Sequence, residues 1–99
     1  MVRTTLRPDA ESAAAARRFV ADVLSQRGFS RSGIEDAVLM TSEAVTNVVV
    51  HAGTALDLIV MADARLARVE VHDADPTDLV PAPARPEEAA GLGLRVIDA

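Results

Sequence analysis

The longest hydrophobic pattern in the chain runs from Ile34 to His51 and repeats at helical spacing. Apolar or small residues recur every three or four positions, so they form one stripe that can face a core. The stripe comprises Ile34, Ala37, Val38, Thr41, Val45, Val48 and Val49. Gly53 follows as a stop signal. The pattern predicts a helix over residues 34–51 with one face packed on a hydrophobic core.

A second helix is predicted upstream of the first. Pro8 and Asp9 suit its opening turn, and Gly28 suits the position just beyond its end. Its apolar stripe comprises Ala16, Phe19, Val20, Val23 and Leu24. Ser32 is a candidate N-cap for the helix over residues 34–51. The two patterns therefore predict two consecutive helices joined by a short turn.

Strand patterns flank these helices. Residues 2–6 form a short candidate strand, and residues 55–62 and 66–73 form a candidate hairpin around a turn at residues 63–65. In the last strand Arg68, Glu70 and His72 alternate with Ala67, Val69, Val71 and Asp73. Asp73 either ends the strand on its core side, where a carboxylate marks a candidate site, or belongs to a turn that begins after His72.

The C-terminal part changes character. Four prolines between residues 75 and 88 disfavour a helix or an inner strand, so we expect either a binding loop or a linker. Gly91 and Gly93 then lead into an apolar helical pattern. Glycines at a helix N-terminus let backbone N–H groups approach a phosphate, although such a pair also serves as an ordinary turn. We predict a glycine-led helix here.

Composition narrows the chemistry. Ninety-nine residues form a single domain, 1–99, and the absence of Cys excludes disulfides, thiolate zinc sites and thiol nucleophiles. All ten basic residues are Arg, which excludes a phosphate-loop lysine or a lysine Schiff base. A net charge of −5 without a basic face argues against nucleic-acid binding. No apolar run approaches membrane-spanning length, so we expect a cytoplasmic protein.

Glu43 and Asn47 are the candidate chemical groups of the longest helix. They lie four residues apart, on one face and opposite the apolar stripe. A carboxylate beside an amide oxygen suits a hydroxyl group or a hard cation such as Mg²⁺. Met40 and Val50 flank them and indicate a second half-buried face. The alternative is an ordinary amphipathic helix with a solvated Glu and Asn.

Taken in order, these motifs are more specific than any one of them. E-A-V-T-N in a helix, a hairpin ending in V-E-V-H-D, a Pro-rich loop and a G-L-G-L segment resemble the GHKL (Bergerat-fold, histidine kinase-like) ATP-binding domains. Within that group the chain is most similar to the small actinobacterial anti-sigma-factor serine/threonine kinases. The resemblance implies an α/β (α+β) two-layer sandwich, with a mixed, mainly antiparallel sheet, helices on one face, and ATP between the layers.

The resemblance also implies roles for individual residues. Asn47 would ligate Mg²⁺, and Glu43 would act as the general base that accepts the proton of a substrate hydroxyl. Asp73 would accept a hydrogen bond from the adenine amine. Gly91 and Gly93 would donate backbone N–H groups to the phosphates. Residues 75–90 would form the ATP lid.

The chain departs from the family pattern at two places. The family's adenine motif reads D-x-G-x-G, whereas residues 73–77 read D-A-D-P-T and lack both glycines. The family also continues through two further strands after the point that corresponds to Ala99. We therefore expect either a truncated chain or a sheet that a partner completes, and an unpaired sheet edge makes a homodimer possible.

Three functions follow as hypotheses. The first is an ATP-dependent anti-sigma regulator that phosphorylates an anti-anti-sigma partner, with the sigma factor as its other protein partner. The second is a non-catalytic ATP-binding or protein-interaction module, which the altered adenine motif favours. The third is a structural α/β interaction domain that binds no ligand.

Overall fold

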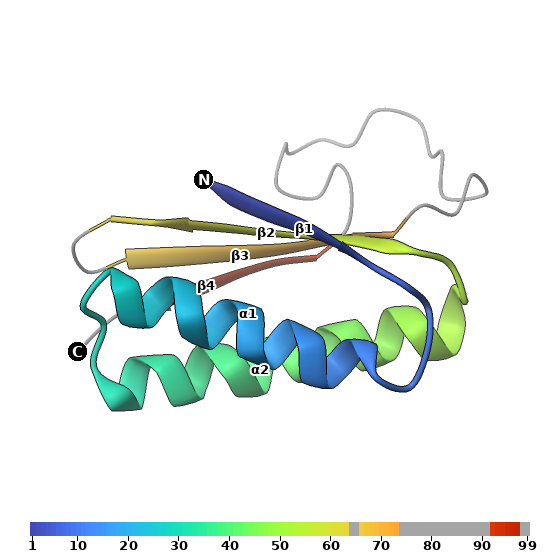
Figure 1. Ribbon diagram of the computed structural model, residues 1–99, viewed down its shortest axis with the longest axis horizontal. Helices are drawn as coiled ribbons and strands as arrows, with labels where there is room; N and C mark the ends of the chain where they lie inside the picture. Colours follow the sequence, from blue (N-terminus) through green and yellow to red (C-terminus); the bar gives the residue numbers. More distant parts are fainter. Residues whose placement is uncertain (64–65, 74–91, 98–99) are drawn as a thin grey trace.

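The computed structural model describes residues 1–63, 66–73 and 92–97. The elements, in chain order, are β1 (Val2–Leu6), α1 (Ser12–Gln26), α2 (Arg31–His51), β2 (Leu56–Ala62), β3 (Leu66–Asp73) and β4 (Leu92–Ile97). The strands form one sheet in the order β1-β2-β3-β4, and all strand pairs in the described part are antiparallel. Both helices cover the same face of this sheet (Figure 1). The predicted two-layer α+β sandwich is confirmed.

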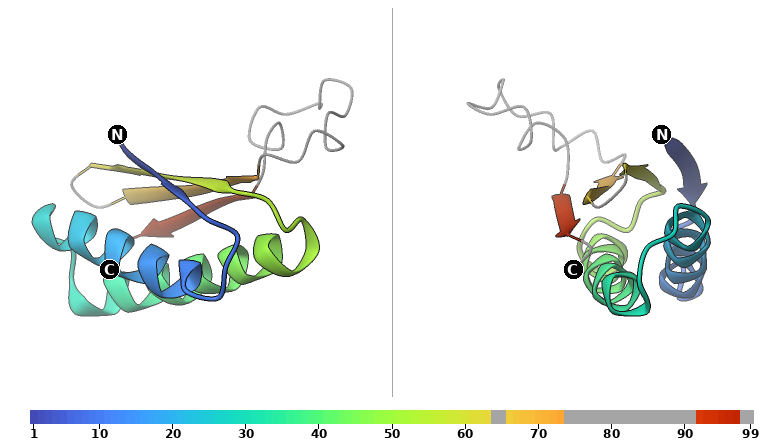
Figure 2. Two further views of the ribbon diagram at one scale, coloured as in Figure 1. Left: turned by 45° about the vertical axis from the view of Figure 1, so that its right-hand side comes forward. Right: turned by 90° about the vertical axis from the view of Figure 1, so that its left-hand side faces the viewer.

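The two helices divide the sheet between them. Helix α1 contacts β1 and β2, whereas α2 contacts β3 and β4. Figure 2, in its right-hand view, shows β1 beside α1 and β4 beside α2. Helix α2 therefore lies over the β4 half of the sheet, and its flank away from α1 faces the β4 edge of the domain. Neither helix in the described part of the chain has the length and apolarity that crossing a membrane requires.

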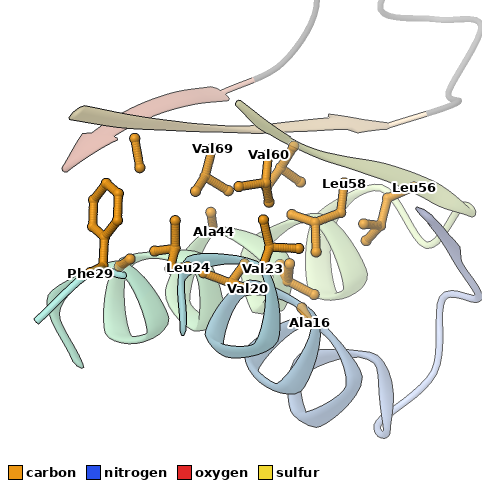
Figure 3. Close-up of a cluster of buried hydrophobic side chains, with 14 residues drawn as sticks. Ala16, Val20, Val23, Leu24, Phe29, Ala44, Leu56, Leu58, Val60 and Val69 are labelled. Atoms are coloured by element: carbon orange, nitrogen blue, oxygen red, sulfur yellow. The ribbon is translucent and has the colours of Figure 1, made fainter. Parts of the chain in front are cut away.

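The core lies between the helices and the inner face of the sheet (Figure 3). Successive strand residues point to opposite faces, so alternate residues of β2 and β3 enter the core. The buried apolar strand residues are Leu56, Leu58, Val60, Ala67, Val69 and Val71, and those of the helices include Ala16, Val20, Val23, Leu24, Ala37, Ala44 and Val45. Each fully buried Val or Leu stabilises the fold by about 1.5–3 kcal/mol.

Helix α1 begins later than the sequence predicted. It starts at Ser12, because Asp9 forms a turn in front of it. The Asp9 Oδ1 atom accepts the backbone N–H of Glu11 at 2.9 Å, and the Asp9 carbonyl accepts the hydroxyl of Ser12 at 2.9 Å. Asp commonly makes such local bonds to the following backbone. The expected opening at Pro8 and Asp9 is therefore wrong by about one helical turn.

Helix α1 ends as predicted, at a glycine. Gly28 has a φ of +81°, a conformation that residues with a Cβ atom avoid. Its N–H donates to the Ser25 carbonyl at 3.1 Å, and the Phe29 N–H donates to the Leu24 carbonyl at 3.0 Å. These two bonds make a Schellman motif. The chain can therefore reverse at once and start α2.

Helix α2 starts at Arg31, and Ser30 caps it. The Ser30 hydroxyl accepts the backbone N–H of Gly33 at 3.1 Å. The predicted cap, Ser32, is wrong because it lies within the first turn. The hydrophobic stripe begins only at Ile34, so the stripe alone could not reveal the polar first turn of the helix.

The segment predicted as a glycine-led helix is instead strand β4. It pairs antiparallel with β3 and places Gly93 opposite Glu70 and Leu94 opposite Val69. A helix of this length that contained Gly93 would gain few hydrogen bonds against a costly nucleation. The edge of β3 offers backbone donors and acceptors that require partners, and β4 satisfies them. Gly91 and the predicted lid, residues 75–90, lie outside the described residues.

Candidate functional site

Glu43 and Asn47 lie on the outer side of α2, one turn apart. Both side chains are exposed, whereas Ala37, Thr41 and Ala44 on the opposite side are buried. The predicted position opposite the core is therefore confirmed. The expectation of a second half-buried face is wrong at its C-terminal end, because Val50 is 69% exposed, and holds only for Met40.

A contact between the two helices shows how this outer side of α2 is oriented relative to α1. The guanidinium of Arg17 on α1 donates to the Ser42 hydroxyl at 3.0 Å, so Ser42 marks the side of α2 that faces α1. At 3.6 residues per turn, Glu43 lies about 100° and Asn47 about 140° around the helix axis from Ser42. Glu43 therefore points outward, away from the sheet, and Asn47 is turned further from α1, toward the β4 side of the domain.

Asp73 is the last residue of β3, and it continues the inner face of the strand. It has the same alternation as the buried Val69 and Val71, and it lies opposite the buried Leu56 of β2. Of the two alternatives left by the sequence, a strand that runs through Asp73 and one that ends at His72, the first is the observed one. The Asp73 side chain is half-buried at the rim of the core.

The candidate residues of α2 and β3 share one end of the sandwich. Helix α2 ends at His51, and β2 begins five residues later at Leu56, directly opposite Asp73. Figure 1 shows the end of α2, the start of β2 and the end of β3 together at its right-hand side. Strand β4 also begins at this end, since Leu92 pairs with Val71.

The glycines do not join this group in the predicted way. Gly93 lies within β4, where its backbone is opposite Glu70 in the sheet and not at the N-terminus of a helix. Gly91 lies outside the described residues. The structure thus places Asp73 and Asn47, which lies one turn before the end of α2, at the same end of the sandwich, with Glu43 one turn further back along the helix. The predicted glycine-led helix is not among the described elements.

The chemistry of these side chains fits a metal–phosphate ligand better than a bare ion. No group of three or more His, Cys, Asp or Glu side chains in the described residues could hold a metal ion. Mg²⁺ commonly takes one or two protein oxygens and completes its six ligands with phosphates and water. The exposed amide oxygen of Asn47 can serve as one such ligand. An ion here would take its other ligands from a bound phosphate compound.

The outer face of the sheet carries a charge network that the sequence did not reveal. The Asp57 carboxylate on β2 accepts hydrogen bonds from the Thr5 hydroxyl at 2.7 Å and from the Arg3 guanidinium at 2.5 Å, both on β1. The Thr5 hydrogen bond, followed by that of Arg3, lowers the pKa of Asp57 below its ordinary value. Only the register of β1 against β2 places these residues together.

A second network lies on the same face, along β3. The Glu70 carboxylate accepts hydrogen bonds from His72 Nε2 at 2.7 Å and from Arg68 Nε at 2.9 Å. The His72 hydrogen bond is the largest cause of a lowered pKa at Glu70, and burial opposes it in part. Alternation along β3 places these residues on the face opposite Asp73, so both networks stabilise the sheet away from the candidate site.

Comparison with known proteins adds an independent observation. Residues 6–99 match the family model of the histidine kinase-like ATPase domain. The matched range begins at the last residue of β1 and includes both helices, the three other strands, and all of Glu43, Asn47, Asp73, Gly91 and Gly93. No curated protein matches the chain.

Proposed function

Because the chain belongs to the histidine kinase-like ATPase domain family, we propose that it is an ATP-dependent anti-sigma regulator. In this proposal it transfers a phosphoryl group to a serine or threonine of an anti-anti-sigma partner and also binds a sigma factor. The observation that carries the proposal is the placement of Glu43 and Asn47. They are exposed one turn apart on the outer side of α2, and Asn47 lies one turn before the end of that helix, at the end of the sandwich where β3 ends with Asp73.

Each of these residues has a separate task. Asn47 provides an amide oxygen to Mg²⁺, and Asp73 accepts a hydrogen bond from the adenine amine. Bound Mg-ATP supplies the phosphoryl group and the charge neutralisation that phosphoryl transfer needs. Glu43 accepts the proton from the substrate hydroxyl, and its exposure leaves the carboxylate accessible to a protein substrate.

A non-catalytic nucleotide-binding or protein-interaction module is the second candidate. The observation in its favour is Gly93, whose backbone lies in the sheet opposite Glu70 and not at the N-terminus of a helix, where it would cradle a phosphate. The loop that follows Asp73 also lacks both glycines of the family's adenine motif. Such a module would bind ATP or a protein partner without transferring phosphate.

Thermal unfolding with and without Mg-ATP tests nucleotide binding. A ligand at a hundred times its Kd stabilises the folded state by about 2.7 kcal/mol. We expect Mg-ATP to raise the midpoint of the wild-type chain, and Asn47→Ala or an excess of EDTA to remove most of that rise. Gln26→Ala is the matched control, because it removes an exposed amide at the other end of the domain. A folded wild-type chain that Mg-ATP does not stabilise would overturn the kinase and the nucleotide-binding module, and it would leave a protein-interaction module.

Phosphoryl transfer from radiolabelled ATP to an anti-anti-sigma protein of the source organism separates the two candidates. A general base contributes about 10²–10⁴-fold to rate, so Glu43→Ala should abolish measurable transfer while the thermal shift with Mg-ATP persists. Asp22→Ala is the control, since it removes an exposed carboxylate of α1 that lies outside the candidate site. A thermal shift without transfer by the wild-type chain would favour the non-catalytic module.

A further inference from the structure

One stripe of α2 combines the proposed base with exposed apolar side chains. Leu39, Glu43, Thr46 and Val50 follow one another at spacings of four, three and four residues, so they line one side of the helix. All four are exposed, and the exposed fractions of Leu39 and Val50 are 61% and 69%. A single exposed apolar residue is ordinary. Two that bracket the proposed catalytic carboxylate form a surface on which a substrate can rest.

The N-terminal part of the same side is acidic. Glu35 and Asp36 are both exposed, about two turns before Glu43. The nearest cation on the helix is Arg31, whose Nε lies 3.7 Å from Glu35 Oε1. Both of these side chains are largely solvated, at 93% and 71% exposure, so the pair neutralises little of the local charge. The stripe therefore complements a segment with apolar and basic side chains.

We propose, on the basis of the function proposed above, that this stripe docks the serine-bearing segment of the protein substrate. At 1.5 Å per helical residue, Leu39 lies about 6 Å before Glu43, Asp36 about 10 Å before it and Val50 about 10 Å after it. An extended chain advances about 3.3 Å per residue. Side chains alternate between the two faces of such a chain, so only residues two or four positions from the serine share its side. The segment thus carries an apolar residue two positions from the serine on one side, an Arg or Lys four positions away on that side, and an apolar residue four positions away on the other.

The size of the surface favours a transient substrate over a second copy of this chain. A stable dimer buries about 1,200–2,000 Å² in total, and two partly exposed aliphatic side chains on each copy contribute only a small part of that. A substrate must dissociate after each transfer. Weak signalling encounters have interfaces at the small end of the range, and a short stripe with a charged end suits such an encounter.

Serine-centred peptide mixtures with radiolabelled Mg-ATP test the proposal on the full chain. Leu, Arg, Glu or Ala is fixed at one position at a time, up to four residues on either side of the serine. We expect kcat/KM to rise about tenfold for Leu over Ala at the two apolar positions, and about twofold to fivefold for Arg over Ala at the basic one. Because both sides are scanned, the result also gives the direction of the bound segment.

Variants assign each preference to its residue. Leu39→Ser should remove only the preference for Leu two positions from the serine. Val50→Ser should remove only the preference for Leu four positions away on the other side. Asp36→Lys should abolish the preference for Arg at the basic position and create a preference for Glu there. The controls are Leu66→Ser, an exposed apolar residue of β3, and Asp22→Lys, an exposed acid of α1, and neither should alter any preference. The thermal shift with Mg-ATP, measured for every variant, reports on the fold and the nucleotide site.

Three results would overturn the inference. Transfer without any preference, or preferences that these variants leave unchanged, would reject the docking stripe while the kinase activity stands. A stable wild-type dimer that Leu39→Ser and Val50→Ser convert to a monomer in sedimentation experiments would assign the stripe to a second copy. A chain that binds Mg-ATP but phosphorylates no serine peptide would reject both the proposed kinase activity and the docking inference.

Discussion

The hydroxyl of Thr41 offers a direct test of the core. Thr41 lies in the middle of α2 and is fully buried, and its Oγ1 atom has no hydrogen-bond partner among the described residues. Leaving a buried hydroxyl unsatisfied costs about 1–3 kcal/mol. Thr41→Val replaces that hydroxyl by a methyl group of nearly the same shape. We therefore predict that this substitution stabilises the protein.

The magnitude follows from the terms that change. Thr and Val are both β-branched and have similar helix propensities, so the backbone terms nearly cancel. The substitution removes the unsatisfied hydroxyl and buries one more methyl group, which alone is worth about 0.8 kcal/mol. We expect the free energy of unfolding to rise by about 1–2 kcal/mol. This is the lower end of the sum of the two effects, because a small relaxation of the helix can lessen the cost of the unsatisfied hydroxyl in the wild-type protein.

Urea unfolding at 25 °C measures this change as a shift of the midpoint at constant m-value. Thr46→Val is the control, since Thr46 is exposed on the same helix and its substitution should change stability by no more than about 0.5 kcal/mol. Thr41→Ser should destabilise, because it retains the hydroxyl and loses the methyl group. The reasoning is refuted if Thr41→Val lowers stability by more than about 1 kcal/mol. The hydroxyl would then bond to a backbone carbonyl one turn earlier, at Ala37.

Three further predictions concern the caps and the charge networks. Ser30→Ala should lower the free energy of unfolding by about 1 kcal/mol in urea titrations, whereas Ser32→Ala should change it by only a few tenths. Gly28→Ala should cost about 1–2 kcal/mol in the same assay, because φ is +81° there and a Cβ atom would meet no neighbour within 4 Å, so the cost is backbone strain alone. The lowered pKa values of Asp57 and Glu70 mean that their stabilisation is present above their ordinary pKa values of 3.8 and 4.5 and is lost as the pH falls through the lower folded-state values. Asp57→Asn combined with Glu70→Gln should therefore flatten the loss of stability between about pH 5 and pH 2, and an unchanged acid profile would contradict the assignment.

Elements with a strong period and clear turn signals were predictable from the sequence. The strands over residues 2–6 and 66–73 have the predicted bounds, and β2 differs from its prediction by one residue. In each case alternating side chains lie between turn residues, so the local pattern and the tertiary structure agree. The same holds for Gly28, where only a residue that tolerates positive φ can end α1 in this way.

For the candidate site, the sequence predicted which face of its helix or strand each residue lies on, but not how exposed that face is. Helical spacing alone placed Glu43 and Asn47 opposite the core, and strand alternation placed Asp73 on the inner face. Exposure is a different property, because it depends on whether another element covers that side of the helix. No described element covers Val50, so the half-buried surroundings expected there do not exist. The Asp57 network was also missed, since its cross-strand partners come from the other end of the chain. Strand alternation, by contrast, had already placed Arg68, Glu70 and His72 on one face of β3.

For the last strand, β4, the local sequence pattern does not determine the secondary structure. Residues 91–98 read G-L-G-L-R-V-I-D, and their apolar positions satisfy both the helical and the alternating pattern. Neither propensity is strong in so short a segment with two glycines. Hydrogen bonding with a partner remote in sequence then determines the secondary structure. That partner is the edge of β3 from Leu66 to Val71. The same pairing holds Gly93 in the sheet, so the two candidate functions differ in what they require of this strand. A glycine-led helix whose N-terminus binds phosphate requires the segment to leave the edge of β3, whereas a partner-binding module can keep it there.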